Sequence, residues 1–246
     1  TPFFPILAIE EPEAHLHPNA QKKLFNQIDG IEGQKIISTH SPYIASSAQL
    51  CQLRNFYKND ESVCCGAINT KLLTSEDIRK IERHVINTRG ELFFSKIIVF
   101  IEGETEEQAL PIFAEQFFNK RPVEIGIDFV GVGGSGGYLP FLRISEAFKI
   151  PWFIFSDGED ATIKKIGKDL KVLYKRDVNV AKESNIFVLD DGCDFEKYLL
   201  QNGYLNEIKA TLIKLHSEEY IQNQFRLKNG TKKKSIKTGM VCDKCS

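Results

Sequence analysis

Acidic side chains follow three apolar segments of the sequence, at the point where each segment ends. The segments are residues 96–101, 151–156 and 185–190. The acids that follow them are Glu102 and Glu106, Asp157 and Glu159, and Asp194 and Glu196. Carboxylates that lie close together repel one another unless cations neutralise them, and Mg²⁺ and Mn²⁺ prefer such hard oxygen ligands. The pattern predicts a divalent-metal site, although any one cluster alone is also typical of the first turn of a helix.

The apolar segments read as buried strands, and helical patterns separate them. Helices are predicted over residues 105–119 and 138–148, and a further strand over 127–132. Alternating strands and helices predict a mainly parallel sheet covered by helices on both faces. Ligands bind beyond the carboxyl ends of the strands in such a sheet. We therefore expect the three acidic clusters to meet at one edge.

A glycine-rich turn follows the strand over 127–132 and allows a second interpretation. Gly131, Gly133 and Gly136 fit the G-x-G-x-x-G pattern of dinucleotide-binding turns, and Asp157 lies at the distance at which such turns have an acid. A nucleotide-binding enzyme that uses the Gly131–Gly136 loop is thus an alternative. A pyrophosphate there would meet uncompensated negative charge, so we favour a tight turn that lets substrate backbone approach.

The N-terminal third has its own alternation of strands and helices. Strands are predicted over residues 4–10 and 34–38, and helices over 18–30 and 42–50. The first strand ends in the adjacent acids Glu10 and Glu11, and His40 follows the second. In phosphate-hydrolysing ATPases such an acid pair divides the work: one acid holds the Mg²⁺ shell and the other orients or activates the attacking water.

Short antiparallel strands are predicted within residues 51–74, followed by an amphipathic helix over Ser75–Thr88 with Ser75 as its N-cap. We place a domain boundary near Arg89–Gly90. The chain is thereby divided into residues 1–90 and 91–246.

Composition excludes several classes of protein. The 246 residues include 32 Lys and Arg against 33 Asp and Glu, so no global field draws the chain toward nucleic acid. The apolar runs fall short of the roughly 18 residues that span a bilayer, and the first residues do not resemble a signal peptide. We expect a cytoplasmic protein without a membrane partner. Six irregularly spaced cysteines do not predict a disulfide framework.

The C-terminal residues carry the main basic segment. Lys232 to Lys234 and Lys237 lie in a run without acids, which predicts either contacts to a phosphate backbone or a solvated loop. Cys242 and Cys245 form only half of a zinc-binding motif, so we favour no zinc here.

The segments A-I-E-E-P, A-H-L-H-P and S-T-H-S-P together resemble the Walker B, D-loop and switch-histidine segments of ABC-type ATPases in the SMC-like and OLD (overcoming lysogenisation defect) branch. The resemblance implies Glu10 as a Mg²⁺ ligand, Glu11 as the catalytic glutamate and His40 as the γ-phosphate sensor. The sequence has no G-x-x-x-x-G-K-[ST] motif, so it holds half of an ATP site. We expect ATP hydrolysis only together with a missing N-terminal half, or a vestigial ATPase fold.

The ATPase-like half is followed by I-E-G-E-T-E-E, G-V-G-G-S-G-G and F-S-D-G-E-D, an order that resembles the OLD-family nucleases, to which the Gabija-type defence nucleases belong. The resemblance implies an α/β fold: the C-terminal half of an ABC-type ATPase sheet over residues 1–90, then a Toprim domain over residues 91–246. It also implies an ATP-regulated, Mg²⁺- or Mn²⁺-dependent DNA endonuclease with two metal ions in each Toprim site.

In the implied site, Glu102 and Asp157 are the central carboxylates, each on one metal ion. The second ligands are Glu106 and Glu159, and Asp194 or Glu196 completes the set. Toprim domains usually read Asp-x-Asp, whereas this sequence reads Asp-Gly-Glu at 157–159, so Asp160 is an alternative to Glu159. Lys237 best matches the family's late lysine, which would stabilise the developing charge.

The resemblance also implies a biological setting: anti-phage defence, a homodimer or higher homo-oligomer, and a helicase or other defence-system partner. A Toprim domain can also belong to a topoisomerase or a primase, but neither the strand-passage tyrosine context nor a zinc ribbon is visible. The competing non-enzymatic interpretation is an SMC-like, ATP-switched scaffold with an acidic but inert second domain.

Overall fold

The computed structural model describes residues 6–133 and 137–217. These residues form two compact units. The first contains the described residues up to Phe155 together with Lys164–Phe187, and the second contains Ser156–Ile163 and the described residues from Val188 onward.

The N-terminal elements of the first unit are a small parallel sheet and its connecting helix. Strands β1 (Ile6–Glu10) and β2 (Gln34–Ser38) pair in parallel, and helix α1 (Pro18–Asp29) joins them. Pro18 at the first helical position favours the start of α1 because its fixed backbone suits that position. These elements confirm the predicted order.

The next helix is shorter than expected. Helix α2 spans only Pro42–Ala45, and a 3-10 turn, η1 (Leu50–Gln52), follows it. The buried Ser41 caps α2, and its hydroxyl accepts hydrogen bonds from the backbone amides of the second and third residues of the helix. The prediction of one helix over 42–50 was therefore wrong in length.

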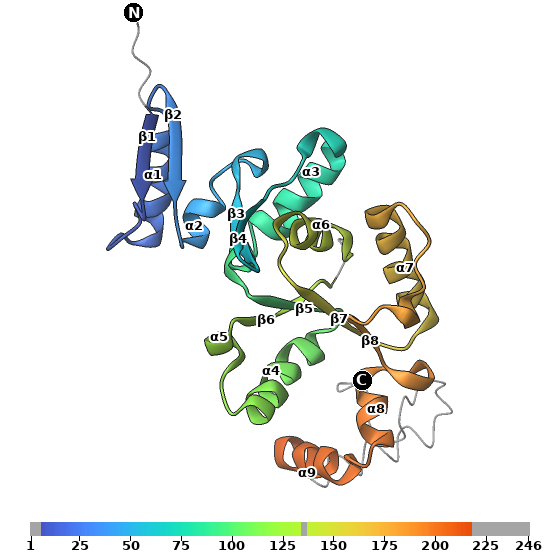
Figure 1. The fold of residues 1–246 in the computed structure, drawn as a ribbon. Helices are drawn as coiled ribbons and strands as arrows, with labels where there is room; N and C mark the ends of the chain where they lie inside the picture. Colours follow the sequence, from blue (N-terminus) through green and yellow to red (C-terminus); the bar gives the residue numbers. More distant parts are fainter. Residues whose placement is uncertain (1–5, 134–136, 218–246) are drawn as a thin grey trace, which may run out of the picture. The chain divides into compact units, whose positions relative to one another are not determined.

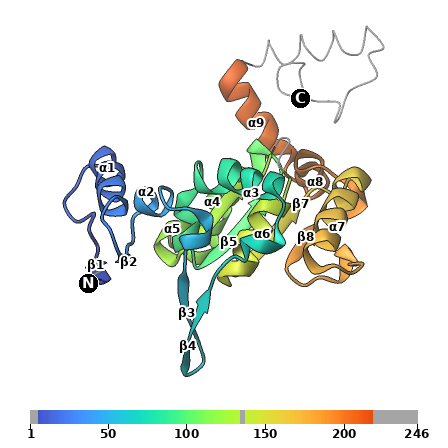
Figure 2. The ribbon, with the colours of Figure 1, turned by 90° about the horizontal axis from the view of Figure 1, so that it is seen from above.

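An antiparallel hairpin and a helix follow. The hairpin consists of β3 (Asn55–Asn59) and β4 (Ser62–Gly66), and Figure 2 shows it extending as a narrow arm. A 3-10 turn, η2 (Thr70–Leu72), leads to α3 (Ser75–Ile81), which continues as a π-helical turn, η3 (Glu82–Ile86), and a 3-10 turn, η4 (Gly90–Phe94).

The N-cap of α3 is Thr74 and not Ser75. The Thr74 hydroxyl accepts a hydrogen bond from the Asp77 backbone amide at 3.1 Å, and the Asp77 carboxylate accepts one from the Thr74 amide at 3.1 Å. This reciprocal capping box satisfies two backbone donors. The helix begins at Ser75 as predicted, but its N-cap is the residue before.

The main sheet has the strand order β6-β5-β7-β8. Its strands are β5 (Ile97–Ile101), β6 (Ile127–Gly131), β7 (Trp152–Ser156) and β8 (Ile186–Val188). Strand β5 is central and pairs in parallel with both β6 and β7. This α/β fold with a parallel sheet is the predicted fold class. Strand β8 is shorter than the predicted 185–190, because a 3-10 turn, η6 (Asp190–Gly192), takes up its end.

The helices predicted over 105–119 and 138–148 are present, and the structure contains further helices that the sequence analysis did not give. The helices are α4 (Glu104–Phe118), α5 (Pro122–Ile125), α6 (Leu139–Phe148), α7 (Asp160–Tyr174), α8 (Phe195–Gln201) and α9 (Leu205–His216), with a 3-10 turn, η5 (Val180–Lys182), before β8. In the first unit, α4 and α6 cover opposite faces of the sheet (Figure 1).

The core of the first unit lies on both faces of β5. Ile98, Phe100 and Ile101 are fully buried, and so is Leu142 of α6. A strand covered on both faces reads as a continuous apolar run, which is why this segment was recognisable in the sequence.

The segment between the two sheets packs on the same core. Asn55 of β3 donates a hydrogen bond to the Phe148 carbonyl oxygen of α6 at 2.8 Å, and Arg143 of α6 forms an ion pair with Asp77 of α3 at 2.6 Å. Helices α3 and α6 are thereby joined within one unit. Among the described residues, no helix is both long and apolar enough to span a membrane.

Candidate functional site

The first pair of acids lies where β5 passes into α4. Glu102 follows the last residue of β5, and Glu106 lies in the first turn of α4. The Glu106 side chain is buried, with 6% of the residue exposed. A helix N-terminus tolerates buried negative charge because its free amides and dipole stabilise anions. Local structure thus explains why both carboxylates are found here.

Gly103 allows Glu106 to fold back over the backbone. A Cβ atom at this position would run into the Glu106 carboxylate. The sequence Glu-Gly at 102–103 therefore brings the Glu106 carboxylate against the residue that follows Glu102. A larger residue at 103 would displace it.

The two carboxylate oxygens of Glu102 differ in their surroundings. Oε1 lies 3.3 Å from Nζ of Lys165, which α7 contributes. Oε2 is buried and has no hydrogen-bond partner among the described residues. A buried acceptor without a partner costs about 1–3 kcal/mol of stability, and a cation would satisfy it. Sequence reasoning missed Lys165, because a lysine on an amphipathic helix carries no spacing signal.

The glycine-rich turn packs against this acidic segment. A Cβ atom at Gly133 would lie 3.1 Å from the Glu102 carbonyl oxygen, and one at Gly131 would run into the Glu107 carboxylate. Arg89 holds that carboxylate in an ion pair at 2.9 Å. Close approach of neighbouring backbone and side chains therefore accounts for these two glycines. Gly136 lies outside the described residues.

The Asp-Gly-Glu segment belongs to the second unit. The Gly158 amide donates a hydrogen bond to the Cys193 carbonyl oxygen at 2.8 Å, and a Cβ atom at Gly158 would run into the Leu189 carbonyl oxygen. The loop over 189–193 thus fixes this segment. Asp157 is half-buried, whereas Glu159 is exposed directly before α7 begins at Asp160.

Asp194 and Glu196 also lie in the second unit, at the start of α8. Asp194 is the N-cap of this helix, and its Oδ1 atom accepts a hydrogen bond from the Lys197 amide at 2.8 Å. Glu196 is exposed in the first turn. Asp194 therefore has the capping role that acids at helix starts commonly have.

The carboxylate oxygens of these acids are ligands that suit a divalent metal ion, although the described side chains are not gathered into a metal-binding group. In residues 6–133 and 137–217, no group of three or more His, Cys, Asp or Glu side chains is gathered closely enough to hold a metal ion. The unsatisfied Oε2 of Glu102 and the buried Glu106 fit a hard cation with oxygen ligands and bound water. Assignment of the six acids as ligands stays a prediction.

The structure brings together two of the predicted ATPase residues. Glu10 ends β1, and the next residue, Glu11, donates its amide hydrogen bond to the Ser38 carbonyl oxygen of β2 at 2.9 Å. Nε2 of His40 lies 3.7 Å from Oε1 of Glu11, with both side chains exposed. Parallel pairing of β1 with β2 is what places these residues side by side.

Glu13 is a residue that the sequence analysis missed. Its Oε1 atom accepts hydrogen bonds from the Thr39 hydroxyl at 2.6 Å and from the His40 amide at 2.8 Å. Burial opposes ionisation of Glu13, but the hydrogen bonds from Thr39 and from the amides of His40 and Ser41 outweigh it and lower the Glu13 pKa. Glu13 thus fixes the backbone that carries His40. The third acid of the E-E-P-E sequence was the feature from which a role for Glu13 could have been predicted.

Several predicted residues lie outside the part of the chain that the structure describes. They are Lys237, Lys232 to Lys234, Cys242 and Cys245.

Two segments of the chain match known families. Residues 93–158 match the family described as overcoming lysogenization defect protein-like, TOPRIM domain. This segment is therefore an OLD-like Toprim domain. Residues 3–91 match a family described as protein of unknown function, DUF2813. The resemblance to the OLD family that the motifs indicated is confirmed.

Two characterised relatives match most of the chain. Endonuclease GajA of Bacillus cereus is 22% identical over 275 residues, which cover 89% of this chain and 40% of that protein. The OLD nuclease of Thermus scotoductus is 29% identical over 163 residues, which cover 61% of this chain and 30% of that protein. The chain spans about a third of the length of the curated relatives that it matches.

Among solved structures, the C-terminal region of the Xanthomonas campestris OLD protein matches 50% of this chain and 64% of its own, with 19% identity and a TM-score of 0.41. The matched segment contains Glu102, Glu106 and Asp157, and Lys165 is a charged neighbour of Glu102.

Proposed function

We propose that this OLD-family chain is the C-terminal part of an ATP-regulated, divalent-metal-dependent DNA endonuclease whose Toprim domain cleaves phosphodiester bonds. The observation that carries the proposal is the state of Glu102. It directly follows the central strand of the sheet, lies four residues before the buried Glu106, and has one buried oxygen without a hydrogen-bond partner among the described residues.

The topology of the sheet supports a site that draws on several acids. Strands β5 and β7 are neighbours, and their register runs from Ile98 opposite Trp152 to Ile101 opposite Phe155. The carboxyl ends of the two strands therefore lie side by side, and each precedes one of the acidic motifs. The resemblance of these motifs to Toprim sites supports Glu102 and Glu106 as ligands of one metal ion and Asp157 and Glu159 as ligands of the other.

The remaining acids have supporting roles in the proposal. Asp194 or Glu196 would complete the coordination, with Asp160 as the alternative to Glu159, and Lys237 would stabilise charge on the scissile phosphate. Bound Mg²⁺ or Mn²⁺ would supply Lewis-acid stabilisation and lower the pKa of a coordinated water. The carboxylates of these acids would hold the ions.

The N-terminal segment supports regulation by ATP. Glu11 and His40 lie together, and Glu13 anchors the backbone of the histidine. In a complete ATPase domain, Glu10 would hold Mg²⁺, Glu11 would orient the attacking water and His40 would contact the γ-phosphate. The ion pair between α3 and α6 connects the N-terminal segment to a helix that packs on the Toprim sheet.

The names of two relatives support the proposed class of substrate. One relative is named an endonuclease and another a nuclease. We propose DNA as the substrate, a cytoplasmic homodimer or higher oligomer as the assembly, and anti-phage defence with a helicase or other defence-system partner as the role.

Supercoiled plasmid, incubated with the purified chain and Mg²⁺ or Mn²⁺ without ATP, tests the proposal. We expect nicking or linearisation by the wild type, and loss of both in Glu102→Gln and Asp157→Asn. Glu76→Gln is the matched control, because Glu76 is an exposed acid whose ion pairs lie on α3. DNA binding without cleavage at any metal concentration, by this chain and by an N-terminally completed version, would instead support the ATP-switched scaffold.

A further inference from the structure

Lys165 is a charged residue that the proposed reaction does not yet use. It lies on α7, 63 residues from Glu102 in sequence, and its ammonium group contacts only one of the two Glu102 oxygens. We propose that Lys165 is a positioning residue, which fixes Oε1 of Glu102 so that Oε2 stays available for a divalent metal ion. This inference rests on the proposed function, because it assumes that Glu102 is a metal ligand.

The pair is partly shielded from solvent. The side chains of Lys165 and Glu102 are 37% and 30% exposed, and the ammonium group also lies 5.9 Å from the centre of the Tyr138 ring. Tyr138 is fully buried, so its ring is a fixed surface on which the lysine side chain rests. A cation over an aromatic face is attracted by the ring quadrupole. Two independent contacts therefore hold the Lys165 ammonium in place.

Helix α7 is itself tied to the neighbouring loop. Asp169, one turn after Lys165, accepts hydrogen bonds from the backbone amides of Tyr138 and Leu139 at 3.0 and 3.1 Å. Helix α6 has no side-chain cap of its own at this end, so Asp169 supplies the missing acceptor from another helix. These hydrogen bonds hold α7, and Lys165 with it, against the start of α6.

Gly137 allows this close packing. Its φ angle is +64°, and a Cβ atom there would lie 3.0 Å from Oδ2 of Asp169 and 3.7 Å from Cε of Lys165. A residue with a side chain would be strained at this φ angle, and its Cβ atom would press on the Asp169 carboxylate that holds α7. The contact between Lys165 and Glu102 is therefore built into the packing of the unit.

The Lys165 ammonium group partly neutralises the negative charge of the acidic segment. Glu102 and the buried Glu106 lie four residues apart at the start of α4, and two ionised carboxylates in one such segment repel each other when no cation neutralises them. Lys165 offsets the repulsion and keeps Oε1 occupied, while Oε2 stays buried and open. A metal ligand that is already oriented loses less freedom on binding, and removal of such outer partners typically weakens metal affinity 10–100-fold.

Binding of Mn²⁺ alone to the full chain, measured by titration calorimetry without DNA, tests the inference. We expect Lys165→Met to weaken Mn²⁺ binding about 10–100-fold, and Lys165→Arg to retain most of the affinity. Lys164→Met is the matched control, because this exposed neighbour on the same helix has the same chemistry. Urea unfolding of each variant shows whether the fold is kept.

The outcomes separate the inference from the proposed function. Unchanged or tighter Mn²⁺ binding by a folded Lys165→Met, beside a wild type that binds Mn²⁺ and nicks plasmid, overturns the positioning role and leaves the nuclease intact. A wild type that binds no Mn²⁺ overturns both.

Plasmid nicking gives a second readout. Positioning predicts that Lys165→Met needs about 10–100-fold more Mn²⁺ for half-maximal nicking, with the wild-type rate restored at saturating Mn²⁺. A rate that stays low at saturation would assign Lys165 to the DNA phosphate and overturn the positioning role.

Discussion

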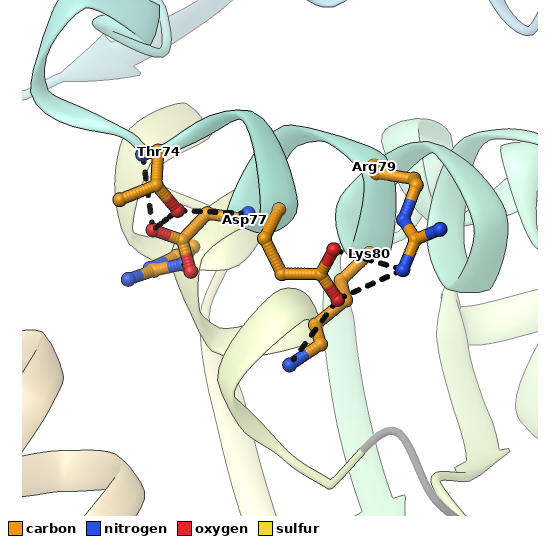
Figure 3. A network of polar contacts seen from close by, with 6 residues as sticks. Thr74, Asp77, Arg79 and Lys80 are labelled. Carbon is orange, nitrogen blue, oxygen red and sulfur yellow. Dashed lines mark hydrogen bonds and ion pairs between the residues drawn. The ribbon is translucent and has the colours of Figure 1, made fainter.

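The ion pair between Asp77 and Arg143 should be a principal link between the N-terminal segment and the Toprim sheet, and Asp77→Asn tests it. Asp77 lies in the first turn of α3, where its carboxylate also accepts hydrogen bonds from the amide and hydroxyl of Thr74 (Figure 3). Arg143 of α6 approaches to 2.6 Å, and the two side chains are only 23% and 16% exposed. Such a charge-assisted pair is stronger than a surface one.

The magnitude follows from the Asp77 pKa. The Arg143 guanidinium, together with the Thr74 hydrogen bonds and against the effect of burial, lowers the pKa of Asp77 from 3.8 to about 2. Each unit corresponds to about 1.4 kcal/mol, so the shift represents about 2 kcal/mol of stability at neutral pH. Partial solvent screening reduces this figure, and we expect Asp77→Asn to lower the free energy of unfolding by about 1–2 kcal/mol.

Urea unfolding, followed by circular dichroism at pH 7, measures the effect. The variants Asp77→Asn, Arg143→Gln and their combination form a double-mutant cycle with an expected coupling energy of about 1 kcal/mol or more. Glu76→Gln is the control on the same helix. Its ion pairs with Arg79 and Lys80 lie in solvent (Figure 3), so it should change stability far less.

The pH dependence gives an independent check. A depressed carboxyl pKa contributes stability above the unfolded pKa, and this contribution is lost as the pH falls through the folded pKa. The difference between wild type and Asp77→Asn should be full above about pH 5 and roughly halved by pH 3. A coupling energy near zero, or a control variant as unstable as Asp77→Asn, would refute the reasoning.

Three further changes have defined outcomes. Gly103→Ala should displace the Glu106 carboxylate and weaken Mn²⁺ binding about tenfold in calorimetry; unchanged affinity would argue against Glu106 as a ligand. Gly158→Ala should force the backbone away from the Leu189 carbonyl oxygen and cost about 1–3 kcal/mol in urea unfolding; wild-type stability would contradict that packing. Burial raises the Asp169 pKa despite hydrogen bonds from backbone amides. In matched urea titrations, the wild type should therefore lose stability relative to Asp169→Asn as the pH rises above about 4. A stability difference that stays constant or changes in the opposite direction would contradict this pKa shift.

The sequence by itself determined the order of elements and the positions of the acidic motifs. The run Ile97–Ile101 reads as a buried strand because every residue in it is apolar, and an acid next to a strand end or helix start is a local feature of the chain. The Toprim resemblance rests on the same local strings, and the match over residues 93–158 confirms it.

Local signals were weaker where two adjacent residues competed for the same role. Thr74 and Ser75 are both good N-caps, and the acid three residues after Thr74 decides in its favour. The helix predicted over 42–50 ends at Ala45, and a separate 3-10 turn begins at Leu50, a division that helix propensity does not indicate. Asp194 could be predicted as a ligand or as a cap, and its hydrogen bond to the Lys197 amide shows that it caps α8.

Tertiary structure alone decided which side chains meet. Lys165 reaches Glu102 from 63 residues away, and Glu13 reaches the amide of His40 from 27 residues away. Neither contact has a sequence period, since each depends on how a helix or loop packs against a sheet. The chain itself specifies the chemical groups and the elements that carry them. The environment of each carboxylate, whether buried, capped or paired with a cation, is set by distant residues that only the folded packing brings within a few ångströms.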